Sequence, residues 1–449
     1  MGIENIAQVT ITTNSRGVDR ASFGIPCVIG SFTFNDASVA KRYELGKVLG
    51  SITTDSTVVS GDKTYRTLQA LAAQTPKPQY VIVGSAPSTV AQSFDITVIA
   101  SDDGDYVLKL QRENATVRTF TYAASGETTT QIATGLAALV NADPGVSAAA
   151  VGPVITVDLT TPALGYYEHV VNLDRTKLSY TDQTPVGSLV SEIQAVRAAN
   201  STWYGLNIAR PAQEAAVALV AANVETQEEL FFHTSYDTAE RTGAGIADNL
   251  GASGLQRSVV VYSDEQTEEK AAAWMSYGFA RDPGSITWAY KRVALATADE
   301  FTSTEEAALE DDVCNRYYDL GGLSVFYPGK VAGDEWIDVI RGRDWLVVRL
   351  RERIANLLIG SPKIPYTQAG AAAVGNAVEA QLREGIAQGY LSPDPLTGVD
   401  GDPPFVVTVP NVSEIDAAVK ATRVLPDVSF TAKLAGAIHQ VQITGVIQV

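Results

Sequence analysis

The residue types that most often carry out chemistry are scarce in this chain. It has three histidines, His169, His233 and His439, and no two of them stand four residues apart, so the HExxH pattern of a zinc protease is missing. The two cysteines, Cys27 and Cys314, are too few for a disulfide framework or an all-cysteine zinc site. Cys27 lies in an apolar run, and Cys314 follows acidic residues that would raise a thiol pKa, the wrong direction for a nucleophile. We therefore expect no catalytic residue, no metal site and no cofactor.

One glycine-rich stretch imitates a dinucleotide-binding loop. Residues 242–248, TGAGIAD, follow a predicted strand and open a predicted helix, as a GxGxxG loop does. Asp248 stands where the third glycine belongs and would place a carboxylate near a phosphate. We expect a turn that opens a helix, with cofactor binding as the competing hypothesis. Residues 61–64 and 101–105 lack the spacing of a Walker A loop and of an EF-hand loop, and are predicted to be turns.

Two clusters of charge stand apart from any catalytic pattern. Residues 299–312 contain seven acidic residues and no Lys or Arg, whereas residues 341–353 contain five arginines and two acidic residues. Solvated helix faces are one interpretation of these clusters. Complementary patches that meet between subunits are the other.

The composition excludes several classes of function. Lys and Arg number 33 against 51 Asp and Glu, a formal charge of −18, so the basic footprint of a nucleic-acid-binding protein is missing. A hydrophobic content of 45% and a charged content of 19% are typical of a packed globular protein. No apolar run reaches the roughly 18 residues that span a bilayer, and the first residues lack the pattern of a signal peptide. We expect no nucleic-acid or membrane partner, and a protein that is soluble and intracellular when made.

Short apolar strands alternate with helices along most of the chain. Strands are predicted at 26–30, 80–84, 203–207, 230–233 and 258–262, and helices at 64–74, 211–223, 246–250 and 265–280. This order predicts an α/β domain with a mostly parallel sheet covered on both faces. Two long helices are predicted next, at 335–358 and 369–388, followed by an acidic Pro/Gly loop at 392–404 and a short helix at 414–422.

Residues 91–175 interrupt this pattern with alternating strands. Ile132, Leu136 and Val140 recur at helical spacing among these strands and would give the segment a core of its own. The segment is predicted to be a strand-rich α+β inserted domain, outward-facing and dispensable. The α/β core is then discontinuous, at 23–90 and 176–437.

Four segments, in order, resemble the tail sheath proteins of contractile phages. Residues 335–346, EWIDVIRGRDWL, resemble the family's iD-x-x-R-x-x-DWL stretch, and residues 364–370, IPYTQAG, its PYT-x-x-G segment. Residues 21–26, ASFGIP, resemble its FG-x-P opening, and residues 435–439, AGAIH, begin a stretch similar to its terminal strand. The resemblance covers residues 1–90 and 176–449 and is to the shorter variant of many myophages and prophages.

The resemblance implies a structural protein rather than an enzyme. Rings of six such subunits stack helically around a tail tube, and the sheath shortens to drive the tube through the host envelope. The implied partners are further copies of the chain, the tail tube protein, and baseplate and tail terminator proteins. The implied location is the virion tail, assembled in the bacterial host cytoplasm. A nucleotide-dependent α/β enzyme using the Gly243 loop is one alternative, and the sheath of a tailocin or related contractile injection system is another.

Both ends of the chain are predicted to join the sheets of adjacent subunits. Residues 1–22 form an extended arm with Val9, Ile11 and Thr13 in a short alternating strand. Residues 438–449 alternate too, and at about 3.3 Å per residue would reach roughly 40 Å. One face of this terminal strand presents Val441, Ile443, Ile447 and Val449. A strand of that length either aggregates or is paired by design, and strand addition to a neighbour's sheet would pair it.

The 414–422 segment is the expected contact with the tail tube. Its side chains carry both signs of charge, as contacts at the rim of an interface do. The residues expected to make this contact are Glu414, Asp416, Lys420 and Arg423.

Overall fold

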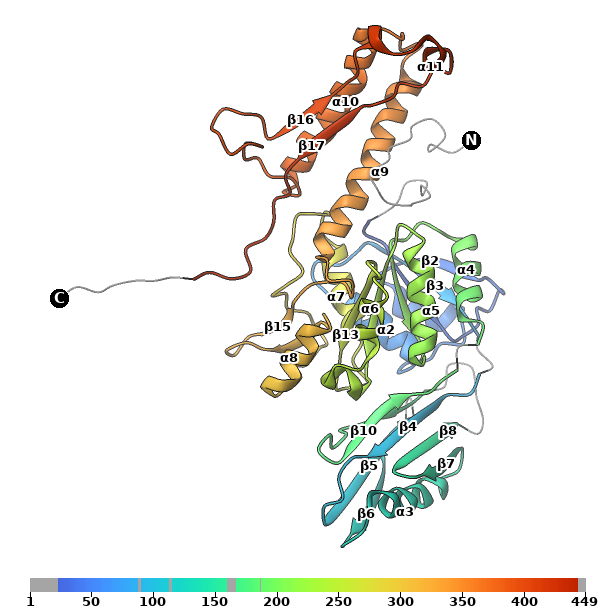
Figure 1. Cartoon of the computed structure of the whole chain (residues 1–449). Helices are drawn as coiled ribbons and strands as arrows, with labels where there is room; N and C mark the ends of the chain where they lie inside the picture. Colours follow the sequence, from blue (N-terminus) through green and yellow to red (C-terminus); the bar gives the residue numbers. More distant parts are fainter. Residues whose placement is uncertain (1–22, 88–89, 113–114, 160–166, 186, 443–449) are drawn as a thin grey trace, which may run out of the picture. The chain divides into compact units, whose positions relative to one another are not determined.

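The computed structural model describes residues 23–87, 90–112, 115–159, 167–185 and 187–442 (Figure 1). Contacts divide the chain into two compact units. Among the described residues, one unit is 23–281 with Tyr290–Ile337, and the other is Asp282–Ala289 with 338–442. The core expected over 23–90 and 176–437 is therefore shared between two units, because the two long helices pack within the second.

A six-stranded sheet forms the centre of the first unit. Its order is β13-β12-β11-β1-β3-β2, and only β2 (Ala40–Glu44) is antiparallel to its neighbour. The parallel strands are β1 (Pro26–Gly30), β3 (Tyr80–Ser85), β11 (Gly205–Ala209), β12 (Leu230–Ser235) and β13 (Ser258–Tyr262). Every residue of β1, β11 and β13 is buried, as expected of a parallel sheet covered on both faces. The mixed α/β fold predicted from the sequence is confirmed.

Helices cover this sheet and follow the predicted order. A large apolar core joins side chains of α4, α5 and α6 to the sheet, including Ile193, Val220 and Leu250. The helices are α1 (Val48–Asp55), α2 (Lys63–Ala72), α4 (Leu189–Ala199), α5 (Glu214–Glu225), α6 (Ile246–Ala252), α7 (Lys270–Phe279) and α8 (Ser303–Asp311). A hairpin of β14 (Arg316–Asp319) and β15 (Ser324–Tyr327) completes the unit.

The inserted domain forms two small sheets and a helix. Helix α3 (Thr129–Asn141) begins at a capping box made by Thr128 and Gln131, and its buried side chains Ile132, Leu136 and Val140 pack into a separate core. The sheets have the orders β10-β4-β8-β7 and β6-β5-β9. Their strands are β4 (Ser93–Val98), β5 (Gly104–Arg112), β6 (Arg118–Ala124), β7 (Val146–Val151), β8 (Val154–Leu159), β9 (Glu168–Val170) and β10 (Leu178–Asp182). Since β10 pairs with β4, this domain continues past residue 175 to Asp182.

The second unit contains the long helices α9 (Ile337–Gly360) and α10 (Gln368–Ala387). Two short strands, β16 (Phe405–Thr408) and β17 (Ser429–Ala432), form an antiparallel pair. The helix predicted at 414–422 is shorter: a 3-10 turn, η3 (Val412–Glu414), precedes α11 (Ala417–Ala421). The Asp416 carboxylate accepts a hydrogen bond from the Ala418 N–H at 2.8 Å, which caps α11 and delays its start.

Candidate assembly surfaces and the carboxyl-edge pocket

The pair β16–β17, called the C-terminal hairpin here, is the first candidate assembly surface. Phe405 is buried, and Gly375 of α10 lets the hairpin approach, since a Cβ there would lie 2.8 Å from Val409 Cγ1. Among the described residues, no third strand pairs with either β16 or β17. A two-stranded sheet is marginal by itself, and unpaired strand edges are templates for another strand. The outer edges of the hairpin are therefore unpaired among the described residues.

The segment that follows the hairpin is exposed and extended. Its first part is anchored, because Ala435 N–H donates to the Tyr390 carbonyl at 2.9 Å. Beyond that point Ile438 is 82% exposed and Val441 is 71% exposed, although both side chains are apolar. Residues 438–442 form no strand within the single chain, so the predicted terminal strand is not formed there. Figure 1 shows the segment extending away from the hairpin.

The other residues predicted to exchange between subunits lie outside the described residues. They are Val9, Ile11, Thr13, Ile443, Ile447 and Val449.

The predicted tube-contact residues lie in a short stretch that includes η3 and α11. Glu414, Asp416 and Arg423 are exposed, Lys420 is half-buried, and α11 has no buried residue. Two exposed apolar side chains accompany them, Val419 at 37% and Val424 at 59% exposure. The sequence analysis missed this apolar component; the alternation of Val419 and Val424 with charged residues could have indicated it.

Some members of the two charge clusters form ion pairs within their own units. Asp299 is buried and pairs with Lys270 at 2.6 Å. Burial raises the pKa of Asp299 to about 6, even though the Lys270 ammonium opposes the shift. Glu305 pairs with Arg241 at 2.6 Å, and this hydrogen bond lowers the pKa of Glu305 to about 2.

In the second cluster, Arg353 Nη2 lies 2.5 Å from Glu384 Oε2. Asp299, Glu305 and Arg353 are therefore each paired within a single unit.

The Gly243 loop is occupied by a carboxyl group of this chain. Gly243, with φ +75°, ends the 3-10 helix η2 (Thr238–Thr242), and Gly245 precedes α6. The buried carboxyl group of Glu240 accepts hydrogen bonds from the N–H groups of Ile246 at 3.0 Å and Ala247 at 3.3 Å. A nucleotide phosphate would need those same N–H groups. The loop is the helix-opening turn that the sequence predicts, and it gives the nucleotide hypothesis no phosphate site.

The histidines and cysteines that could have been catalytic are structural in their surroundings. Burial lowers the pKa of His169 and of His233 to about 3, so both rings are neutral at neutral pH. Burial raises the pKa of the Cys27 and Cys314 thiols well above the usual value, which disfavours the thiolate. His439 Nε2 lies 2.7 Å from Thr287 Oγ1.

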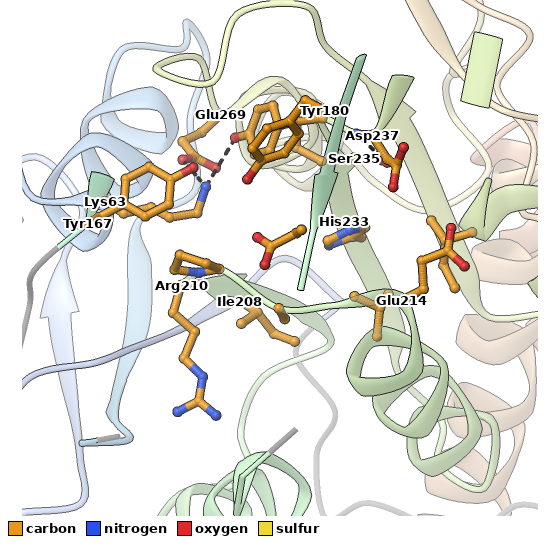
Figure 2. A pocket seen from close by; sticks show the side chains of 17 residues that line it. Lys63, Tyr167, Tyr180, Ile208, Arg210, Glu214, His233, Ser235, Asp237 and Glu269 are labelled. Carbon is orange, nitrogen blue, oxygen red and sulfur yellow. Dashed lines mark hydrogen bonds and ion pairs between the residues drawn. The ribbon is translucent and has the colours of Figure 1, made fainter. Parts of the chain in front are cut away.

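A pocket lies where β11 and β12 end, against residues of the inserted domain (Figure 2). The carboxyl ends of parallel strands are where α/β folds usually hold ligands. Lys63 lies at one side and is already paired, with Glu269 Oε1 at 2.8 Å and the Tyr236 hydroxyl at 3.1 Å. Among the described residues, no group of three or more His, Cys, Asp or Glu side chains is arranged to hold a metal ion.

Comparisons with known proteins agree on one class. Residues 337–447 match the family model "E217 tail sheath protein gp31-like, C-terminal domain". No curated protein matches the sequence. The fold is similar to a chain of an extracellular contractile injection system, the PVC sheath complex in its contracted state. That similarity has 9% identity and a TM-score of 0.52, over 99% of this chain and 97% of that one.

A chain in the anti-feeding prophage baseplate structure, 6-fold symmetrised, is similar at 11% identity and a TM-score of 0.51, over all of both chains. At these identities the two structures show a shared fold. Among the described residues, no helix combines the length and apolar character that crossing a bilayer requires. Residues 337–447 thus match the C-terminal domain of a tail sheath protein family, and the chain as a whole shares its fold with chains of contractile systems.

Proposed function

We propose that this chain polymerises as stacked hexameric rings around a tail tube, and that contraction of this sheath drives the tube through a cell envelope. The observation that carries the proposal is the C-terminal hairpin, whose outer edges pair with no other described strand. An exposed extended segment with apolar side chains follows it in the same unit. Strand addition between copies would satisfy the edge of one subunit with the segment of the next.

The division into units suits a lattice that changes shape. Each unit has packed helices of its own, and the inserted domain has a separate core. Such bodies can move rigidly while the segments that link subunits bend. Residues 1–22 would contribute a second exchanged strand through Val9, Ile11 and Thr13. The partners would be further copies of this chain, a tube protein, and baseplate and terminator proteins.

The tube contact is proposed at Glu414, Asp416, Lys420 and Arg423. Their support is that Glu414, Asp416 and Arg423 are exposed, and Lys420 half-buried, in one short stretch that also contains the exposed Val419 and Val424. Reversing the charges of Lys420 and Arg423 should weaken assembly on tubes while leaving tube-free polymers intact. Unchanged assembly on tubes would contradict this assignment.

Two related biological settings fit this function. The similar solved chains come from an anti-feeding prophage baseplate and an extracellular contractile injection system sheath. A phage tail, assembled in the host cytoplasm, is the first proposal, and a tailocin or injection system sheath is the second. Both share the same mechanical role for this chain.

Negative-stain microscopy of the concentrated full chain tests the function. Long striated tubes are the expected result, and removal of residues 438–449 should leave folded subunits that no longer polymerise. Normal tubes from the truncated chain would refute strand exchange. A compact oligomer with saturable binding of ATP or NAD would instead favour the enzyme hypothesis.

A further inference from the structure

The carboxyl-edge pocket contains more negative charge than its own basic residues neutralise. Both basic residues of the pocket are already paired. Arg210 lies 3.0 Å from Glu192, which lies outside the pocket, and Lys63 is paired with Glu269 in the pocket wall. Three further carboxylates line the pocket, and in the described part of the chain none of them forms an ion pair with Lys or Arg: Asp182, Glu214 and Asp237.

These three carboxylates accept hydrogen bonds only from uncharged donors in the described part of the chain. Asp182 accepts from the Thr184 N–H at 2.8 Å, Asp237 from the Ala239 N–H at 2.9 Å, and Glu214 from the Asn249 side chain at 3.1 Å. Burial raises the pKa of all three, that of Asp237 to about 6. Asp237 is buried, and Asp182 and Glu214 are half-buried. Carboxylates that are shielded from water and form no ion pair favour a cation beside them.

An unpartnered hydroxyl also lines this pocket. Tyr180 is only 2% exposed, and its hydroxyl has no hydrogen-bond partner. Figure 2 shows this hydroxyl facing the pocket. The rings of Tyr167 and Tyr236 also line the pocket, and the Lys63 ammonium already lies over both, at 5.2 and 4.6 Å from the ring centroids. Ile208 and Val217 supply an apolar side suited to methylene groups.

These features select the chemistry of the ligand. A phosphate or other anion would be repelled by the carboxylates, and the described residues offer no cluster for a bound metal ion. A primary ammonium group has three N–H donors, enough for two carboxylates and the Tyr180 hydroxyl at once. We propose that the pocket binds a short-chain primary alkylammonium ion. The ion would join the inserted domain, through Tyr180 and Asp182, to the α/β core, through Glu214 and Asp237.

Calorimetric titration of the full chain with butane-1,4-diamine at pH 7.5 tests the proposal. Saturable binding and a raised melting temperature are expected, with no response to the neutral isostere butane-1,4-diol. Asp182→Asn should weaken binding at least tenfold, and Tyr180→Phe at least threefold. Asp102→Asn, an exposed carboxylate in the same inserted domain, is the matched control and should leave affinity unchanged.

Several results would overturn the assignment. They are no saturable heat, an equal response to the diol, displacement by equimolar potassium chloride, or unchanged affinity in both pocket variants. If the variants fail to fold, the pH dependence of binding to the wild-type chain still tests the site. Lowering the pH from 7.5 to 5 protonates Asp237, whose pKa is about 6, and should weaken binding. Equal affinity at both pH values would count against the site, whether or not the chain forms sheaths.

Discussion

Val441→Asn is the sharpest test of strand exchange, because Val441 is 71% exposed within the single chain. If the predicted strand is added to a neighbour's sheet, this side chain becomes buried there. Burying a valine is worth about 1.5–3 kcal/mol, so the exposed fraction amounts to about 1–2 kcal/mol. Burying an amide in its place adds a cost of about 1–3 kcal/mol. The total, about 3 kcal/mol, should raise the concentration needed for polymerisation about 100-fold.

Sedimentation velocity across a concentration series measures this threshold. Gln442→Asn is the control, since Gln442 is exposed and belongs to the opposite face of the predicted strand. The melting temperature of the subunit should not change in either variant, because neither side chain is buried within it. A Val441→Asn chain that polymerises at the wild-type concentration would refute the predicted exchange or its register.

Three further predictions concern the first unit. Replacing residues 91–182 by a short Gly/Ser linker should leave a soluble α/β domain. A chain that lacks only 91–175 should aggregate, because β10 then loses its partner β4. Equal solubility of the two variants would contradict the boundary at Asp182. Asn315→Ala should lower the free energy of unfolding in urea by about 3–5 kcal/mol, because this buried side chain makes four hydrogen bonds to backbone groups. A loss of less than about 1 kcal/mol would contradict that structural role. Burial raises the pKa of Glu240 from 4.5 to about 8, so the folded state binds this proton more tightly and wild-type stability falls as the pH rises between those values. Glu240→Gln should remove this pH dependence. Between pH 5 and pH 8.5 its free energy of unfolding should rise by about 2–4 kcal/mol relative to that of the wild type. Parallel plots of unfolding free energy against pH for the two proteins would refute the assignment.

Local pattern was enough to predict most strands of the six-stranded sheet. The runs at Pro26–Gly30, Tyr80–Ser85 and Ser258–Tyr262 are short and apolar, so they predict buried strands wherever they lie in the fold. The helix with Ile132 and Leu136 was predicted for the same reason. The helix at 414–422 was predicted too long, because the periodicity gave no sign that Asp416 would cap a later start.

Boundaries and pairings depended on contacts far apart in the chain. Strand β10 belongs to the inserted domain only because it pairs with β4, about eighty residues earlier. Asp299 looked like part of a solvated acidic face, but Lys270 lies beside it in the folded chain. Neither partner can be chosen from spacing, since a cluster of like charges does not say which opposite charge will reach it.

The sequence by itself determined the α/β class, the presence of an inserted domain, and the resemblance that led to the sheath family. Hydrophobic periodicity and ordered motifs are local properties, so they are legible before folding. Only the tertiary structure decided that α9 begins a second unit, that Glu240 occupies the Gly243 loop, and that Tyr180, Glu214 and Asp237 line one pocket. Those outcomes depend on which distant segments share a core, and burial then sets the charge and hydrogen-bonding state of each side chain.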